Sequence, residues 1–367
     1  MKLRNRILST LAIVVALAFV SLAVALSYSS ACKAPQGVVG TGESMKGVVA
    51  RCYGPPQVLQ LEQVPKPTPA DEQILVKVRA AALNPADWHA MRGSPYIMRL
   101  STGIGSPNDP RVGIDFAGTV EAVGKGVTRF KPGDEVFGGV NGAVAEYVLV
   151  RESRGVALKP ANVTFEQAGS VGVAAVTALQ GLRDEGGIKA GQKVLINGAS
   201  GGVGTFAVQI AKHFGAEVTA VCSTRNVELV RSLGADHVID YTQQDFAQSP
   251  ERYDIILDNV ANRSLSDLRQ VLKPTGTIVI VGGAKGDWIG PLLPPLKAAL
   301  LQPFVDQKMG FFIAHFEQED MQFLGELMQA GEVTPVIDRR YALSEVAKAM
   351  EYLEAGRARG KVVLSLE

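Results

Sequence analysis

One short stretch of the sequence decides the fold: Lys193-Val-Leu-Ile-Asn-Gly-Ala-Ser-Gly-Gly-Val-Gly204. A run of aliphatic residues leads into a glycine-rich turn, and Thr205–Phe214 then has a helical pattern. This order is typical of a strand–turn–helix unit that binds a dinucleotide. The glycines allow the turn and the close approach of a pyrophosphate, to which the helix N-terminus offers free N–H groups. Cofactor contacts are therefore predicted at Gly198, Ala199, Ser200, Gly201, Gly202, Val203 and Gly204.

The residues around this stretch alternate between strand and helix patterns. A capping box at 164–167 opens a helix that is predicted to run to about Leu182. Alternation of this kind makes a parallel sheet with helices on both faces, so residues 164–317 are predicted to be an α/β domain. Its other strands are predicted at Glu217–Cys222, His237–Ile239, Ile255–Asp258, Thr277–Val281 and Met309–Phe316.

The preceding part of the chain consists of short strands and turns. Strands are predicted at Lys46–Cys52, Val58–Val64, Ile74–Leu83, Gly118–Val123, Glu135–Phe137 and Ala145–Val150. Glycine and proline separate them, which indicates an all-β, barrel-like unit over residues 46–163. A helix at about Leu343–Glu354 and a strand at Val362–Leu366 are predicted to close the chain.

The residues after the second strand of the α/β domain favour NADPH. An NAD site has an acid about 20 residues after the glycine-rich turn, but Ser223, Thr224 and Arg225 stand there. A hydroxyl and a guanidinium suit a 2′-phosphate, although Arg225 is also compatible with a solvated charge at a helix start. Tyr241 is predicted to brace the adenosine phosphate, unless it is an ordinary strand-end tyrosine. The predicted cofactor contacts are completed by Asn259, Gly282 and Lys361.

Length and composition limit the classes of protein that the chain can belong to. A chain of 367 residues is long enough for two domains. It is 47% hydrophobic and 20% charged, which excludes wholesale disorder. Lys and Arg number 37 against 36 Asp and Glu, so no basic excess exists to bind nucleic acid. Cys32, Cys52 and Cys222 are distant and odd in number, and neither a disulfide framework nor a zinc cluster is predicted from them.

The first 45 residues form a separate segment. Lys2, Arg4 and Arg6 precede the uncharged run Ile7–Leu26, which is long enough to cross a bilayer as a helix. We predict a membrane anchor followed by a flexible linker, and leave open which side of the membrane the body faces. The alternatives are a cleaved signal peptide, a lipoprotein-like site at Ser29–Cys32, a buried helix, and a soluble, complete chain that begins at Met45.

From Met45 to its end, the sequence resembles the medium-chain dehydrogenase/reductase superfamily, in its quinone oxidoreductase/zeta-crystallin branch. The resemblance is carried by residues 191–212, Gly113-Ile-Asp-Phe-Ala-Gly118, Val123-Gly-Lys-Gly-Val127, Lys131-Pro-Gly-Asp-Glu-Val136, Leu233-Gly-Ala-Asp236 and Gly360-Lys361. It implies a GroES-like barrel domain, residues 46–163 completed by 318–367, and a Rossmann domain, residues 164–317. It also implies a homodimer joined through the strand Met309–Phe316.

The resemblance also bears on zinc. The superfamily's alcohol dehydrogenases have a cysteine ligand and a Gly-His-Glu motif, at positions that correspond here to Asn84 and to Gly113-Ile114-Asp115. The thiolate and imidazole ligands are replaced, so the resemblance implies an enzyme without a metal.

Without a metal, hydride transfer to the β-carbon of a quinone or an enone is the least demanding reaction, because hydrogen-bond donors can stabilise the enolate that forms. The candidate catalytic residues are Asn84, which would face the nicotinamide, Asp87, which would orient its neighbours, and Tyr96, which would donate to the substrate oxygen, with His89 as second choice. Asp87 is also a candidate helix cap, and Tyr96 a lining residue. The alternative functions are a metal-independent alcohol dehydrogenase, a reductase of another double bond, and a non-catalytic NADPH-binding sensor or structural protein.

Overall fold

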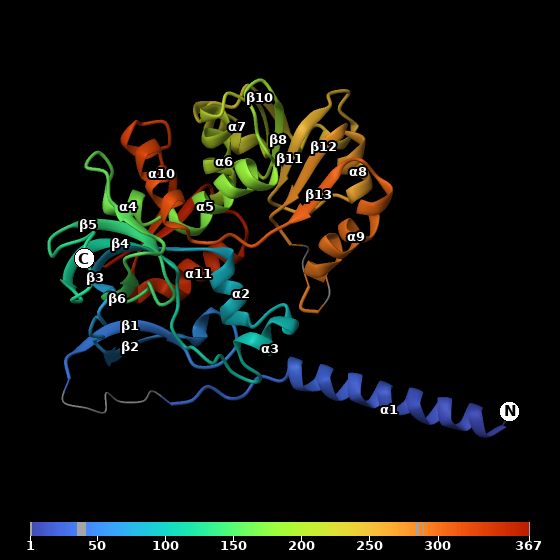
Figure 1. Ribbon diagram of the computed structural model, residues 1–367, viewed down its shortest axis with the longest axis horizontal. Helices are drawn as coiled ribbons and strands as arrows, with labels where there is room; N and C mark the ends of the chain where they lie inside the picture. Colours follow the sequence, from blue (N-terminus) through green and yellow to red (C-terminus); the bar gives the residue numbers. More distant parts are fainter. Residues whose placement is uncertain (1, 35–41, 284–285, 289, 367) are drawn as a thin grey trace.

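A computed structural model describes residues 2–34, 42–283, 286–288 and 290–366 of the 367-residue chain. Figure 1 shows a sheet built from the first half of the chain and its C-terminus, and beside it a second sheet with helices on its faces. An α/β architecture of this kind was predicted. The N-terminal helix α1, Lys2–Ser27, extends away from both sheets (Figure 1).

The first sheet contains seven strands in the order β14-β15-β3-β4-β5-β7, with β6 paired to β3. All its pairs are antiparallel except β14 with β15. Because β14 and β15 come from the C-terminus, the end of the chain completes this sheet. A two-stranded antiparallel sheet, β1-β2, lies beside it (Figure 1). The strands are β1 Ser44–Ala50, β2 Leu59–Pro65, β3 Gln73–Leu83, β4 Asp115–Val123, β5 Glu135–Gly139, β6 Tyr147–Arg151, β7 Val156–Leu158, β14 Ile337–Ala342 and β15 Lys361–Ser365.

The second sheet is parallel throughout, with the strand order β10-β9-β8-β11-β12-β13. The order reverses beside β8, the strand that precedes the glycine-rich turn. Its interior is aliphatic, and Leu195, Ile196 and Leu257 have no exposed surface. The strands are β8 Lys193–Asn197, β9 Glu217–Cys222, β10 His237–Asp240, β11 Tyr253–Asp258, β12 Leu272–Ile280 and β13 Lys308–Phe311.

The helices connect the strands or cover the sheets. Those of the first half are α2 Pro85–Arg92, α3 Arg99–Thr102, α4 Phe165–Ala168 and α5 Gly172–Gln180. Those of the second half are α6 Gly202–His213, α7 Val227–Ser232, α8 Leu265–Gln270, α9 Leu293–Leu301, α10 Gln318–Gln329 and α11 Val346–Glu354. Short 3₁₀ turns lie at 56–58, 96–98, 224–226, 246–248, 290–292, 302–304 and 343–345, and a π turn at 181–185.

The helix predicted from residue 164 to about residue 182 is interrupted. It begins as expected, with the Thr164 hydroxyl accepting from the Gln167 backbone N–H, but α4 ends at Ala168 and α5 begins at Gly172. The break lies where Gly169 packs on the first sheet: a Cβ there would stand 2.9 Å from the Ala80 carbonyl oxygen. The sequence around residues 164–182 favours a continuous helix, but it does not show the contact of Gly169 with the first sheet.

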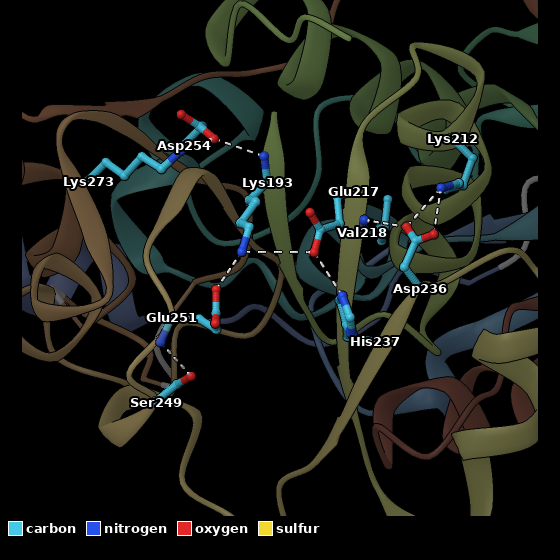
Figure 2. Close-up of polar contacts among 10 residues, drawn as sticks. All are labelled: Lys193, Lys212, Glu217, Val218, Asp236, His237, Ser249, Glu251, Asp254 and Lys273. Atoms are coloured by element: carbon cyan, nitrogen blue, oxygen red, sulfur yellow. Dashed lines mark hydrogen bonds and ion pairs between the residues drawn. The ribbon is translucent and has the colours of Figure 1, made fainter. Parts of the chain in front are cut away.

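The charged residues at the amino ends of the parallel strands form a structural network. Lys193 at the start of β8 pairs with Glu251, His237 at the start of β10 contacts Glu217, and Lys212 pairs with Asp236 (Figure 2). Asp236 also accepts from the backbone N–H of Val218 at 2.7 Å. Ligands of such sheets bind at the opposite, carboxyl edge, so this network stabilises the sheet away from the site.

The N-terminal segment departs from the prediction at its cysteines. Cys32 and Cys52 form a disulfide with Cα atoms 4.7 Å apart, so the prediction that no cysteines pair was wrong. Spacing could not show this, because the segment after α1 folds back onto the loop between α3 and β4, where Ser29 pairs with Gly105. Most of the predicted flexible linker, residues 35–41, lies outside the described residues.

The membrane anchor is not supported by the structure. Residues 2–27 form the helix α1, but the side chains of Lys2, Arg4 and Arg6, which were expected to orient an anchor, lie outside the described residues. Among the side chains that are described, no helix combines the length and the apolar character needed to cross a bilayer.

Buried Arg99 holds the end of α1. Its Nη1 donates to the carbonyl oxygens of Leu26 and Tyr28 at 2.9 and 2.8 Å, and its Nε donates to the carbonyl oxygen of Gly93 at 2.8 Å. The guanidinium also stacks on the rings of Tyr53 and Tyr96. Residues 26–32 are therefore part of the folded body and not a free linker.

Candidate active site

The predicted cofactor residues gather at the carboxyl edge of the parallel sheet. The glycine-rich turn follows β8, Ser223 follows β9, Tyr241 follows β10, Asn259 follows β11 and Gly282 lies just beyond β12. The carboxyl ends of parallel strands form one edge, and ligands of such sheets bind where the strand order reverses. The fold thus brings together residues that are up to 84 positions apart in the sequence.

The glycine-rich turn has the space that a pyrophosphate needs. Gly198 has φ of +78°, a left-handed conformation that favours glycine. Gly201 precedes α6 as its N-cap, and a Cβ on it would meet only the Gly198 carbonyl oxygen at 3.4 Å. A Cβ on Gly204, in contrast, would stand 2.2 Å from that oxygen. Gly201 therefore leaves room for a ligand, and Gly204 permits α6 to pack on the turn.

Two buried acceptors at this edge lack a partner among the described residues. Asn226 donates through Nδ2 to the hydroxyl of Ser200 at 2.9 Å, but its Oδ1 accepts nothing. Asn259 donates to the Asn197 carbonyl oxygen at 3.1 Å, and its Oδ1 is likewise unpaired. Buried polar atoms are normally satisfied, so both fit a site that a polar ligand completes. The sequence prediction missed Asn226, whose short polar side chain after Arg225 gave no distinctive signal.

The part of the edge that follows β9 carries a guanidinium, which was predicted to bind the adenosine phosphate. Arg225 is exposed and donates through Nη2 to the Arg357 carbonyl oxygen at 2.9 Å. Arg357 lies between α11 and β15, so this bond crosses the boundary between the two sheets, which we call the seam. Tyr241, which follows the neighbouring strand β10, is 53% exposed. Asp240 ends the same strand β10, but its carboxylate accepts from Thr224, Thr242 and Gln243. These bonds occupy the oxygens that a ribose hydroxyl would need.

A second cluster, of four buried polar side chains, lies on the side of the seam that belongs to the first, seven-stranded sheet, called the barrel sheet from here on: Asn84, Asp87, Asp115 and Lys361. The Lys361 ammonium is 3.0 Å from Asp115 Oδ2 and also donates to Asn84 Oδ1. Asn84 Nδ2 donates to Asp115 Oδ2 at 2.9 Å, and the Asn84 backbone N–H donates to Asp87 Oδ2 at 2.7 Å. Asp87 therefore receives the backbone N–H of the residue before α2, as the helix-cap alternative requires. The prediction had placed Lys361 at the cofactor, and the structure directs its ammonium to Asn84 and Asp115.

Burial raises the pKa of Asp87 to about 7, because the charged carboxylate is poorly solvated there, and the Asn84 N–H only partly offsets this. An unfolded aspartate titrates near 3.9. Between about pH 4 and pH 7 the folded chain therefore keeps a proton that the unfolded chain has lost. It follows that this group makes the free energy of unfolding fall as the pH rises through that window.

We therefore expect Asp87→Asn to flatten the pH dependence of stability. The amide keeps an acceptor for the Asn84 N–H and cannot ionise. Between pH 5 and pH 8 the parent should lose roughly 2–3 kcal/mol more than the variant, at about 1.4 kcal/mol per pH unit. Urea unfolding of both proteins at the two pH values measures this difference, and equal slopes would refute the assignment.

Tyr96 lies apart from this cluster, and none of its described contacts reaches Asn84 or Asp87. It stands in the turn before α3, where its backbone N–H donates to the Asp287 carbonyl oxygen at 2.6 Å and its ring meets Trp288 edge-on at 5.0 Å. Ser94 adds a hydroxyl bond of 2.8 Å to the Asp287 carboxylate. The turn that carries Tyr96 thus touches the loop after β12 across the seam. His89, the second-choice donor, has Nδ1 within 2.7 Å of the Ser94 carbonyl oxygen.

The residues do not fit a catalytic zinc. Zinc needs three or four thiolate, imidazole or carboxylate ligands, and no such group of His, Cys, Asp and Glu exists in the part of the chain that the structure describes. Asn84, at the cysteine position, and Asp115, which follows the histidine position Ile114, instead contact the Lys361 ammonium. A cation of the chain itself thus lies beside the position where the resemblance places the cysteine ligand.

A glycine-rich turn at the carboxyl edge of a parallel sheet, joined to a barrel sheet, defines a nicotinamide-dependent oxidoreductase. Residues 70–161 match the family described as alcohol dehydrogenase GroES-like domain, and residues 233–364 match the family described as zinc-binding dehydrogenase. The chain belongs to the medium-chain dehydrogenase/reductase superfamily, as the sequence predicted. Members of this superfamily similar to the chain carry the names of NAD(P)H oxidoreductases and enone reductases.

Three similar proteins show how far the likeness extends. A 2-methylene-furan-3-one reductase of Solanum lycopersicum is 37% identical over 328 residues, which cover 85% of this chain and 76% of the relative. An NADPH-dependent alkenal/one oxidoreductase of Arabidopsis thaliana is 36% identical, over 88% of this chain and 80% of the relative. The quinone oxidoreductase of Coxiella burnetii has a solved structure that matches with a TM-score of 0.77 and 30% identity, over 89% of this chain and 100% of that one.

Proposed function

We propose that the chain reduces quinones or α,β-unsaturated carbonyl compounds with NADPH and without a metal. The single observation that carries this is the contact between the two sheets: the Gly360 backbone N–H donates to Ser200 in the glycine-rich turn, and the next residue, Lys361, extends its ammonium to the buried Asn84 and Asp115. The relatives named for enone, alkenal and quinone reduction support the substrate class. We assign residues 164–317 to the cofactor domain, and residues 46–163 with 318–367 to the substrate domain.

The proposed roles combine the sequence prediction with the positions of the side chains. Bound NADPH supplies the hydride. The turn Gly198–Gly204 and the N-terminus of α6 bind the pyrophosphate, and Arg225 with Ser223 and Tyr241 binds the adenosine 2′-phosphate. Asn259, Gly282 and Asn226 line the same edge. Asn84 donates at the nicotinamide side, Asp87 fixes the start of α2, and Tyr96 donates to the substrate oxygen.

The test is the oxidation of NADPH by the purified chain with a panel of quinones, enones, saturated ketones and alcohols. Turnover with quinones or enones, and none with saturated ketones, is expected, because only conjugation spreads the negative charge that hydride transfer creates. Turnover confined to alcohols with NADP⁺ would favour a metal-independent alcohol dehydrogenase. Tight NADPH binding without turnover of any compound would favour a sensor or structural protein.

Cofactor choice is expected to depend on Arg225. Arg225→Ala should weaken NADPH roughly ten- to a hundredfold and NADH little, because a hydrogen bond between charged groups contributes about 1.5–3 kcal/mol. Fluorescence titration with both cofactors measures this. Arg231→Ala is the matched control, since Arg231 pairs with Glu228 on the neighbouring helix α7. An equal loss for both cofactors would remove the assignment of Arg225 to the 2′-phosphate.

Tyr96 is expected to act on turnover. If its hydroxyl donates to the developing enolate, Tyr96→Phe should lower kcat and kcat/KM together by about tenfold or more. The phenyl ring keeps the stacking on Trp288 and Arg99, so folding should be unchanged. Steady-state kinetics with a saturating quinone decide this. A changed KM with the parent kcat would leave Tyr96 as a lining residue.

We also propose that the chain forms a homodimer through β13. This strand is at the edge of the parallel sheet, and Phe311 and Ile313 near its end are 47% and 70% exposed. An uncovered, apolar strand edge favours pairing with a second copy. Sedimentation equilibrium tests this, and a mass equal to one 38.9 kDa chain would contradict it.

A further inference from the structure

Lys361 connects the cofactor turn with the substrate side of the seam. It is 2% exposed and begins β15 of the barrel sheet. The backbone N–H of Gly360 donates to the Ser200 carbonyl oxygen at 2.9 Å, and a Cβ on Gly202 would stand 3.4 Å from Lys361 Cδ. The stem of Lys361 therefore runs against the glycine-rich turn, while its ammonium reaches Asn84 and Asp115.

Asp115 is fixed from the other side of the seam. It is fully buried, and its Oδ1 accepts from the Val173 backbone N–H at 2.7 Å in the first turn of α5. Its Oδ2 receives both the Lys361 ammonium at 3.0 Å and Asn84 Nδ2 at 2.9 Å. The carboxylate thus holds Lys361 and Asn84 together, and α5 holds the carboxylate.

This arrangement leaves one orientation for the Asn84 amide. An ammonium only donates hydrogen bonds, and a carboxylate only accepts them. A flipped amide would direct its N–H groups at Lys361 and its oxygen at Asp115, and both contacts would be lost. In the observed orientation, Asn84 Nδ2 donates to Asp115 Oδ2, and the Asn84 side chain also interacts with the buried Asp87 carboxyl. The buried pair therefore sets the direction of the Asn84 N–H groups.

We propose that Lys361, paired with Asp115, is a positioning residue for hydride transfer, which holds the Asn84 amide in a single orientation at the reacting end of the site. This inference rests on the proposed function. It gives Lys361 a role other than direct binding of the cofactor, and it explains why a fully buried ion pair is kept at the seam: its fixed charges orient a neutral donor. Preset donors are effective because they need no reorganisation when charge develops.

The test removes both charges together, since removal of one would leave the other buried and unpaired. The double variant Asp115→Asn/Lys361→Met keeps the side-chain volumes and removes the constraint on Asn84. We expect kcat with a quinone to fall at least tenfold, while the Kd for NADPH, from fluorescence titration, changes less than threefold. Should the double variant not fold, Lys361→Gln is measured by the same two criteria.

The matched control is Asp236→Asn/Lys212→Met at the opposite edge of the parallel sheet (Figure 2). There too an aspartate accepts from a lysine ammonium, at 2.8 Å, and from a backbone N–H, at 2.7 Å. Its kcat should equal that of the parent.

Two results would overturn the inference while the parent remains active. A kcat within threefold of the parent would make the buried pair a packing feature only. A Kd for NADPH that rises in step with the fall in kcat would make Lys361 a cofactor-binding residue. A parent that turns over no quinone or enone would instead refute the proposed function, and this inference with it.

Discussion

Replacement of Arg99 by methionine is expected to lower the free energy of unfolding by about 3–5 kcal/mol. Arg99 is 2% exposed, and it is a donor to the carbonyl oxygens of Leu26, Tyr28 and Gly93. Each buried acceptor that loses its donor costs about 1–3 kcal/mol, and the stacking on Tyr53 and Tyr96 is lost as well. Methionine replaces the aliphatic stem but none of the donors.

Urea unfolding measures the loss, and limited proteolysis should show earlier cleavage at residues 26–34 in the variant. Arg129→Met is the matched control, because Arg129 also stacks on a ring and donates to a carbonyl oxygen, but on the surface. Its stability should change by less than about 0.5 kcal/mol. If the two variants unfolded alike, Arg99 would not be what fastens the N-terminal segment.

The same contacts bear on the alternative that the chain begins at Met45. A chain that begins at Met45 was predicted to be complete, since the family resemblance starts there. The structure shows that such a chain lacks Leu26, Tyr28 and Ser29, which bind Arg99, and Cys32, which bonds to Cys52. Removal of these residues leaves a buried guanidinium without several of its acceptors, so it is expected to destabilise the turn that carries Tyr96.

The parallel sheet could be predicted from the sequence because its signals are local. Strands β8 and β9 occur where they were expected, and β10, β11 and β12 differ at their ends. Strand β13 spans only Lys308–Phe311, whereas Met309–Phe316 was predicted. Buried parallel strands are short aliphatic runs between helices, and each can be recognised alone. Strand β14 and helix α10 were not predicted. Strand β14 has no aliphatic run, and its residues are half-buried or exposed.

The cofactor edge and the buried polar cluster also differ in how far they could be predicted from the sequence. The cofactor edge follows from the glycine-rich turn and the ends of strands, which are positions along the chain. The cluster of Asn84, Asp115 and Lys361 joins residues as far apart as 277 positions, and no spacing rule connects them. Asn84 was predicted from the resemblance, at the position of a metal-ligating cysteine and facing the nicotinamide, and Asp115 was noted only within the stretch Gly113-Ile114-Asp115. That the ammonium of Lys361 lies between them required the three-dimensional structure.

Substitution of glycines in the turn is expected to have the largest effect on NADPH binding. Gly204 and Gly201 separate two causes of that effect, displacement of α6 and loss of space for the pyrophosphate. A Cβ on Gly204 would stand 2.2 Å from the Gly198 carbonyl oxygen and 2.6 Å from Ala199 Cα, so Gly204→Ala must move α6 or the turn. We expect a loss of stability of about 1–3 kcal/mol or more, together with at least a hundredfold weaker binding of NADPH, because the displaced N–H groups no longer meet the pyrophosphate.

Gly201→Ala is expected to weaken NADPH without this loss of stability. Its φ of −82° suits alanine, and the added Cβ meets only one backbone oxygen at an ordinary 3.4 Å. The methyl group instead occupies the space that the proposed function assigns to the pyrophosphate. Thermal unfolding without cofactor and titration with NADPH distinguish the two variants. If Gly201→Ala bound NADPH like the parent, the turn would not approach the pyrophosphate at this residue, and its glycine would serve the fold alone.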